Sequence, residues 1–244
     1  MTIPISAVLI TKNAELHLAK VLAALTHCAE IVVLDCGSTD RTEAIARQAG
    51  ARFEHQVFLG FGPQKNHAIA LARNDWILSI DADEVLDDEA QRAITQLDLL
   101  DASRSWRIRR RTFVGSSELR HGHLNDAPVR LFNRTTAQFN QVPVHESVVT
   151  HGRELKLPGS IQHYSFIDAA DLVARGAGYA RHKATIYRSK GRRCAAPWLL
   201  VRACGAFLKS YVFKAGFLDG RLGVVAAFSA ALNASTALAM ASEQ

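Results

Sequence analysis

Three carboxylates follow a run of mostly apolar residues in the segment "WILSIDADEVL", residues 76–86. Asp81, Asp83 and Glu84 lie within four positions, directly after Trp, Ile, Leu, Ser and Ile. Carboxylates crowded at the end of a buried strand repel one another unless a positive charge lies among them. A divalent cation would supply that charge, because such ions prefer oxygen ligands and can join carboxylates to the two phosphates of a nucleotide. The segment is therefore a candidate site for a metal and a diphosphate.

Two other interpretations of these acids compete with the metal site. A single acid here would cap a helix or face water, but Asp87 and Asp88 can cap the helix predicted downstream. The letters "ILSIDADEV" also resemble the nucleophile motif of haloacid dehalogenase-type phosphatases, in which Asp81 would attack phosphorus and Asp83 would act as acid and base. That family usually carries the motif on its first strand, whereas about 75 residues of alternating elements precede it here. The metal interpretation is favoured.

The residues that precede the cluster alternate between two hydrophobic patterns. Apolar runs predict strands at residues 5–10, 30–35, 51–57 and 75–81. Helical spacing predicts helices at residues 14–25, 38–50, 63–73 and 86–100. Ser38 is the expected cap of the second helix. Such alternation predicts a parallel sheet with helices on both faces and ligands at the carboxyl ends of its strands, where Asp35 and Asp81 fall.

The pattern changes after residue 103. Strands are predicted at residues 105–114, 128–134, 138–149 and 153–166, and helices at 168–190, 197–215 and 221–242. We interpret the later strands as an antiparallel extension of the same domain. The predicted fold is α/β, with a Rossmann-like, mostly parallel sheet and a C-terminal helical appendage. The predicted domains are 1–166, with halves 1–100 and 101–166, and 167–244.

Composition indicates an ordinary folded protein. The chain has 244 residues, of which 48% are hydrophobic and 21% charged, which argues against disorder. Its four cysteines have no metal-type spacing, so reduced thiols in a cytosolic protein are expected. The start "MTIPISAVLITKN" has no basic region leading into an apolar core, and no signal peptide is expected.

Three separated segments carry a family resemblance. "ISAVLITKNAE", "IVVLDCGSTDRT" and "FGPQKNHAIALARNDWILSIDADEVL" resemble, in order and spacing, the nucleotide-binding half of glycosyltransferase family 2. The resemblance covers residues 3 to about 100. It implies a GT-A fold, a nucleotide-sugar donor and a divalent metal, Mg²⁺ or Mn²⁺.

The resemblance also implies roles for single residues. It assigns the donor pocket to Thr11, Lys12, Asn13, Asp35, Ser38, Lys65 and Asp81. Asp35 would contact the base or the ribose, and Lys65 either contacts the donor or is a solvated lysine at a helix end. Asp83 is the expected metal ligand. His163 either approaches the metal or is a core histidine, and Glu84 either orients the site or binds the sugar.

Sugar transfer with inversion needs a base that takes the proton of the acceptor hydroxyl. The resemblance points to Glu146, in "PVHES", after a predicted strand on the acceptor side. Asp126 is the second candidate base. A structural alternative pairs Glu146 with a nearby arginine such as Arg130.

The later segments narrow the resemblance to one group of enzymes. "RTFVGSSELRHGHLNDAPVRLFNR", "VHESV", "LPGSIQHYSF" and "GFLDGRLG" resemble bacterial transferases that add a hexose to the lipopolysaccharide inner core, in particular heptose β-1,4-glucosyltransferases. UDP-glucose is then the expected donor. The letters "LNDAPVRLF" depart from the expected aromatic and proline before the aspartate. The alternatives are a transferase for a polyprenyl phosphate or another surface glycan, or a non-catalytic module that binds a nucleotide sugar or nucleic acid.

The C-terminal region is strongly basic. From Arg175 to Arg221 there are eleven Lys or Arg and one acid, Asp219, interleaved with aromatic residues. With a glycolipid acceptor, this favours contact with the anionic surface of the inner membrane over nucleic acid, and a solvated basic face remains the alternative. The Ala-rich residues 222–242 favour a packed or surface helix over a spanning one. The expected location is cytoplasmic, peripheral on the cytoplasmic face of the bacterial inner membrane, with no nucleic-acid partner.

Overall fold

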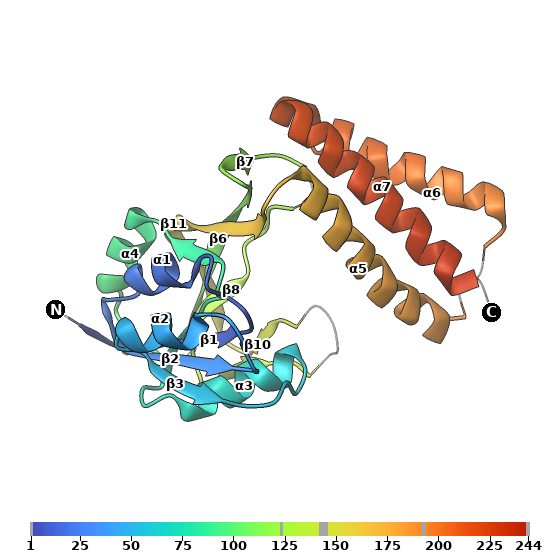
Figure 1. Ribbon diagram of the computed structural model, residues 1–244. Helices are drawn as coiled ribbons and strands as arrows, with labels where there is room; N and C mark the ends of the chain where they lie inside the picture. The colour runs from blue at the N-terminus through green and yellow to red at the C-terminus, as the bar shows by residue number, and fades with distance from the viewer. Residues whose placement is uncertain (1, 123, 142–145, 192–193, 243–244) are drawn as a thin grey trace. The chain divides into compact units, whose positions relative to one another are not determined.

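The computed structural model describes residues 2–122, 124–141, 146–191 and 194–242, and it separates into two compact units (Figure 1). The first unit comprises Met1–Arg110 and Asp126–His163, and the second comprises Arg111–Asn125 and Tyr164–Gln244. Two long strands, β6 (Arg104–Val114) and β11 (Arg153–Phe166), run from the first unit into the second. The boundary between residues 166 and 167 stays a prediction.

One mixed sheet forms the centre of the first unit. Besides β6, β11 and the short β7 (Ser117–Leu119) at its edge, its strands are β1 (Ile3–Thr11), β2 (Cys28–Asp35), β3 (Arg52–His55), β4 (Trp76–Ser79), β5 (Glu84–Leu86) and β8 (Val129–Asn133). The strand order is β3-β2-β1-β4-β8-β6-β11-β5. The first four strands in this order pair in parallel, and β8 then pairs antiparallel with both β4 and β6. The predicted α/β fold with an antiparallel extension is confirmed, and parallel pairing joins the first four strands in this order.

Continuous apolar runs explain why the parallel strands lie at the centre. Every residue of β4 is buried, and so are the last four residues of β2. Because alternate residues point to opposite faces, burial without alternation means that both faces are covered. The covering helices are α1 (Leu18–Ala23), α2 (Thr42–Gln48), α3 (Phe61–Leu71) and α4 (Asp88–Thr95). α1, α2 and α4 are shorter than predicted, and α3 has the predicted length but begins two residues earlier.

The strand ends place the candidate residues on one edge of the sheet. In the parallel register Thr11 lies opposite Asp35, and Val8 lies opposite Ser79. The chain leaves β4 two residues before Asp81 and returns at once as β5, a three-residue strand that pairs antiparallel with β11. A separate two-stranded sheet consists of β9 (Ala137–Phe139) and β10 (Val148–Thr150). Residues 142–145 of the predicted strand 138–149 lie outside the described residues.

Three helices dominate the second unit, as predicted. They are α5 (Ala169–Ser189), α6 (Ala196–Leu208) and α7 (Gly220–Ser242), and the short turns η1 (Lys209–Phe213) and η2 (Gly216–Asp219) join the last two. The unit also contains β7 (Ser117–Leu119), which forms a hairpin with the end of β6.

Close packing of small residues holds α5 against α7. A Cβ atom added to Gly176 of α5 would lie 2.8 Å from the Ser229 hydroxyl of α7. Ala180 and Tyr187 of α5 share an apolar cluster with Ala237 and Ala241 of α7. By length and composition alone, Gly216–Ser242 could cross a membrane, although 44% of its most apolar window is buried within the protein.

Candidate active site

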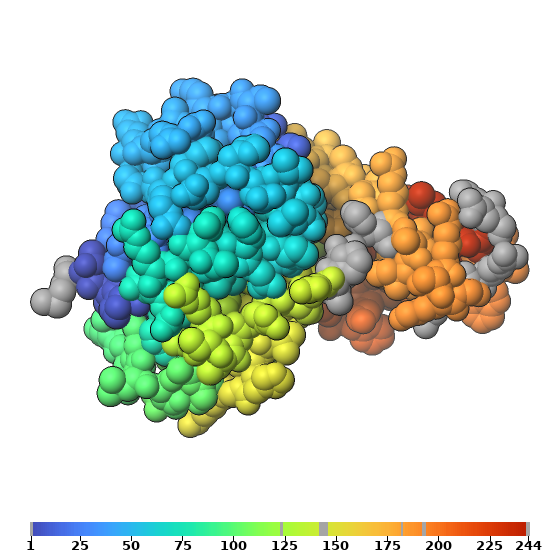
Figure 2. Space-filling model, turned by 90° about the horizontal axis from the view of Figure 1, so that it is seen from below, coloured from blue at the N-terminus to red at the C-terminus, as the bar shows by residue number. Residues whose placement is uncertain are grey.

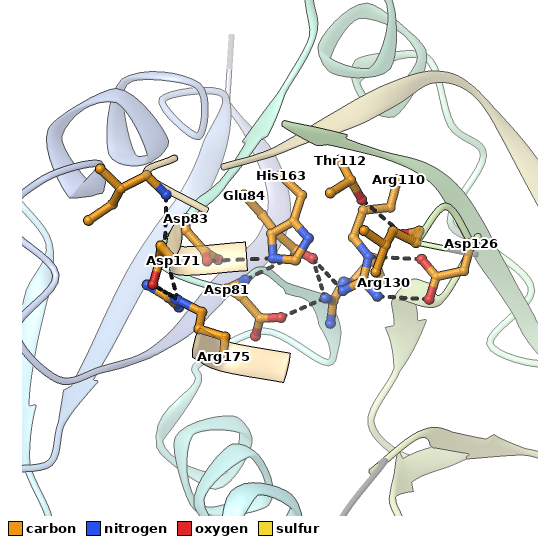
Figure 3. A network of polar contacts seen from close by, with 12 residues as sticks. Asp81, Asp83, Glu84, Arg110, Thr112, Asp126, Arg130, His163, Asp171 and Arg175 are labelled. Carbon is orange, nitrogen blue, oxygen red and sulfur yellow. Dashed lines mark hydrogen bonds and ion pairs between the residues drawn. The ribbon is translucent and has the colours of Figure 1, made fainter. Parts of the chain in front are cut away.

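An ion cluster stands at the carboxyl end of β4, between acids of the segment "DADE" and cations from distant elements (Figure 3). Arg130 of β8 donates through Nη2 to Asp81 Oδ2 at 2.7 Å and to Glu84 Oε1 at 2.5 Å. Lys65 of α3 lies 2.9 Å from Asp81 Oδ1. Glu84, Arg130 and Lys65 are all buried. The protein therefore supplies much of the positive charge that this acidic segment requires.

The contact between Asp81 and Arg130 favours the charged form of both groups. Burial raises the pKa of the Asp81 carboxyl, but Arg130 and Lys65 outweigh burial and hold that pKa far below its usual value. Burial lowers the pKa of the Arg130 guanidinium, but Asp81 and Glu84 outweigh it and raise that pKa. Sequence analysis missed Arg130 as a site residue. The sequence pattern that could have indicated its role is an arginine inside the apolar strand "VRLF", because a buried charge without a partner would destabilise the fold.

Asp83 lies apart from these cations and beside a histidine. Its Oδ2 is 3.5 Å from Nε2 of His163 on β11, and the Asp83 side chain is partly exposed. Among the described residues, no three His, Cys, Asp or Glu side chains are grouped so that they could hold an ion alone. One carboxylate and one imidazole nevertheless fit a divalent ion that takes its remaining ligands from a diphosphate and water. Their roles as metal ligands stay a prediction.

Lys65 connects the acidic segment to the predicted base. Its Nζ donates to Glu146 Oε1 at 3.0 Å while it also contacts Asp81, and the ammonium lies 5.1 Å from the centre of the Phe139 ring. Lys65 is thus a buried bridge and not a solvated lysine. The alternative prediction, that Glu146 pairs with an arginine such as Arg130, is wrong. Glu146 pairs with Lys65, and Arg130 pairs with Asp81 and Glu84.

Asp126 belongs to the same network through a second arginine. Arg110 donates to both of its carboxylate oxygens, at 2.8 and 2.7 Å, and reaches Glu84 at 3.2 Å. This bidentate contact occupies both oxygens of a side chain that is 53% exposed. Asp126 therefore orients Arg110, and Glu84 anchors two arginines. Arg110 was not predicted as a site residue, whereas orienting the site was one of the two roles predicted for Glu84.

A second group of predicted residues meets where β1 and β2 end. The Asp35 carboxylate accepts hydrogen bonds from the Thr11 hydroxyl and the Gly37 amide, both at 2.8 Å. It also accepts from the Ser38 amide at 2.8 Å and the Ser38 hydroxyl at 2.5 Å. Gly37 has φ +98°, which the tight turn beneath the carboxylate requires. Asp35 thus organises the loop.

The predicted helix cap at Ser38 is wrong. α2 begins four residues later, at Thr42, and its N-cap residue Arg41 forms no side-chain cap hydrogen bond. The Ser38 hydroxyl instead donates to Asp35 and accepts from the Asn13 amide at 2.7 Å. A hydrogen bond to an ionised carboxylate is stronger than one between neutral groups, which favours the contact of the hydroxyl with Asp35.

The loops that follow β1 and β2 hold each other in place. Asn13 has φ 49°, and its side-chain oxygen accepts from the Thr39 amide at 2.8 Å. Lys12 is exposed beside it. An open cavity of about 340 Å³ adjoins this edge and is lined by Asp35, Gly37, Ser38, Glu43, Arg47, Phe53, Glu54 and His55. The structure therefore brings together two groups of predicted residues. One group is Thr11, Asn13, Asp35 and Ser38, and the other is Lys65, Asp81 and Glu146.

Asp35→Asn is expected to lower the free energy of unfolding by about 2 kcal/mol at neutral pH, because charge-assisted hydrogen bonds are lost. Burial raises the pKa of Asp35, but the bonds from Ser38, Thr11 and Gly37 outweigh it and lower that pKa below 3.8. The stabilisation is thus complete above pH 3.8 and is lost as the pH falls through the folded-state pKa. Urea unfolding across acidic pH should show the difference from wild type shrinking, and a constant difference would contradict this. Exposed Asp98→Asn is the control.

The sequence of this chain is similar to glycosyltransferases over most of its length. Residues 6–153 match the family model described as glycosyl transferase family 2. An uncharacterised glycosyltransferase of Rickettsia felis is 30% identical over 91% of this chain and 83% of the relative. The lipopolysaccharide core biosynthesis glycosyltransferase LpsC of Rhizobium meliloti is 29% identical over 93% of this chain and 90% of the relative.

The chain is also similar to part of a solved enzyme structure. Glucosyl-3-phosphoglycerate synthase from Mycobacterium tuberculosis, in complex with Mn²⁺, UDP and glucosyl-3-phosphoglycerate, is 25% identical. The match covers 46% of this chain and 44% of that one, with a TM-score of 0.36.

Proposed function

Because the chain belongs to glycosyltransferase family 2, we propose that it moves a hexose from a nucleotide sugar to the lipopolysaccharide inner core, with inversion at the anomeric carbon. UDP-glucose is the proposed donor. The resemblance to LpsC across nearly the whole chain supports the proposed acceptor. The proposed place of action is the cytoplasmic face of the inner membrane, where such an acceptor would be met.

The donor lies along the edge where β1, β2 and β4 end. The loops held by Asp35 and Ser38 form the nucleotide side, because they are rigid and stand at the carboxyl ends of parallel strands. Asp83 and His163 would hold the divalent metal, which neutralises charge on the departing diphosphate. Lys65, fixed beside Asp81, adds a second positive charge on the same side.

One contact carries the proposal: the Lys65 ammonium touches both Asp81 of the acidic segment and Glu146. This contact supports the proposal that a carboxylate from the acceptor half acts next to the donor, as a single displacement step requires. Glu146 takes the proton of the acceptor hydroxyl while the hydroxyl oxygen attacks the anomeric carbon and the bond to the diphosphate breaks. Lys65 holds Glu146 Oε1, and Oε2 receives the proton.

Chelation is expected to abolish both donor hydrolysis and transfer, and Mn²⁺ or Mg²⁺ should restore them. A panel of nucleotide sugars, followed by core-truncated lipopolysaccharides as acceptors, checks this by measuring released nucleoside diphosphate. Asp83→Asn should raise the metal concentration needed for half-maximal rate by at least about tenfold, because one ligand is weakened. Asp88→Asn, which changes an exposed acid five positions away, is the matched control.

The same assay separates the alternatives. Full metal-dependent turnover in Asp83→Asn would refute its role as a ligand. Transfer to a polyprenyl phosphate or to another surface glycan, and not to core lipopolysaccharide, would replace the proposed acceptor. Binding of nucleotide sugars without turnover under any metal would indicate a binding module.

A further inference from the structure

An apolar helix without a buried residue stands out in the second unit. α6 reads "APWLLVRACGAFL", and none of its thirteen residues, all within the described part of the chain, is buried. Such a helix normally packs its apolar side chains into a core. Figure 2 shows much of α6, in orange, at the molecular surface.

The two sides of α6 differ in their environment. The inner side faces α7, where the Phe207 ring lies 4.9 Å from that of Phe228. The outer side presents Trp198, Val201 and Leu208, whose exposed fractions are 61%, 55% and 48%. Their spacing of three and seven residues places them on one stripe of the helix. Exposed Val212 and Phe213 continue the apolar surface along η1.

Basic side chains border this stripe. Arg202 directly follows Val201, and Lys209 directly follows Leu208. Both basic residues are exposed, and they lie along the flank of the apolar stripe. We call Trp198, Val201, Leu208, Arg202 and Lys209 the α6 face.

The acid nearest to the α6 face in sequence does not offset its positive charge. The Asp219 side chain is 4% exposed and accepts from the backbone amides of Arg120 and His121, at 3.1 and 2.8 Å. It is the single acid among eleven Lys and Arg between residues 175 and 221.

We propose that the α6 face docks on an anionic lipid bilayer, with Trp198, Val201 and Leu208 entering the headgroup region and Arg202 and Lys209 contacting lipid phosphates. An apolar stripe with flanking basic residues is the composition of helices that lie in the membrane interface. A second copy is the competing occupant. Two copies paired through this face would bring like charges together, whereas an anionic surface attracts them.

Docking serves the proposed function, since a glycolipid acceptor is reached at the membrane, but it is tested without that function. Of the three tryptophans, Trp76 and Trp106 are buried, so a change in emission on adding vesicles reports Trp198. Vesicles of phosphatidylcholine with phosphatidylglycerol should shift the emission to the blue and carry the protein upward in a flotation gradient. Pure phosphatidylcholine vesicles should do neither, and added salt should reverse binding.

Matched variants identify the surface. Arg202→Gln with Lys209→Gln should weaken partition onto anionic vesicles about tenfold or more. The control variant combines Arg92→Gln with Lys156→Gln, at exposed sites in the first unit, and should bind anionic vesicles like wild type. Val201→Ser with Leu208→Ser should also weaken partition by at least about tenfold. The same exchange at exposed Val57 and Leu100 is its control.

Three outcomes would overturn the proposal. They are equal binding to neutral and anionic vesicles, α6 variants that bind like wild type, and a dimer in solution that the α6 substitutions dissociate. Donor hydrolysis measured without vesicles should stay unchanged in these variants. Loss of vesicle binding with hydrolysis intact would therefore concern docking alone, and absent hydrolysis with docking intact would concern the proposed function alone.

Discussion

Arg130→Met is expected to lower the free energy of unfolding by about 3 kcal/mol or more, which is roughly 10 °C in melting temperature for a chain of this size. The guanidinium is buried and its Nη2 alone contacts both Asp81 and Glu84. Its removal leaves Glu84, which is fully buried, with Arg110 as its remaining cation. Chemical unfolding of both proteins at neutral pH measures the difference.

A second substitution tests whether the loss comes from unpaired charge. Arg130→Met combined with Glu84→Gln should recover part of the stability, because the fully buried carboxylate is then replaced by a neutral amide, while Asp81 keeps Lys65 as a partner. Arg107→Met serves as the control, since Arg107 forms an exposed ion pair with Glu154, and it should change stability by less than about 1 kcal/mol. Equal losses for Arg130→Met and Arg107→Met would show that the buried cluster does not stabilise the fold.

Glu146→Gln is expected to lower kcat for sugar transfer by about 10²–10⁴-fold, while KM for the donor and the melting temperature stay near those of wild type. Glutamine is nearly the same size, and its side-chain oxygen can still accept from Lys65, as Glu146 Oε1 does at 3.0 Å. The substitution therefore removes the ability to take a proton and leaves the contact. Steady-state kinetics with saturating metal and acceptor provide the measurement.

Asp126→Asn is the matched test of the other candidate base. Asp126 has both oxygens bound by Arg110, so this variant should lose much less activity. A large loss in Asp126→Asn together with a rate within a few-fold of wild type in Glu146→Gln would move the role of base to Asp126. Large losses in both would show that Arg110 must be held in place for turnover.

Local pattern predicted the strands well because burial in a parallel sheet leaves a direct mark on composition. The runs that became β1, β2 and β4 are mostly apolar, and their ends fell within two residues of the prediction. Helix bounds were less accurate, since polar residues in α2 and α4 fit a helix and a loop equally well. β5 was missed because three residues carry no period, and its pairing with β11 joins segments far apart in sequence.

The same limit applies to the candidate site. The acidic segment and the turn after Asp35 were visible because their residues are contiguous. The ion pairs of these acids were not visible, since Lys65 was predicted only as a donor-pocket residue or a solvated lysine, and Lys65 and Arg130 come from a helix and a strand on either side of the segment in sequence. Charge repulsion alone could show that positive charge was needed. It could not distinguish a metal from an arginine, and the fold supplies the arginine.

The path of β6 and β11 bears on how a minimal enzyme could be made. Cutting the chain once, after β11, would remove α5–α7. Val114 and Leu119 would then lose the Leu172 and Ala226 side chains against which they pack. An aggregation-prone apolar hairpin would remain. Excising residues 111–125 as well avoids this, and the new ends need no long linker. Arg110 and Asp126 already face each other as an antiparallel bridge, 2.8 Å from amide to carbonyl, so a two-residue Asn-Gly turn could close the gap.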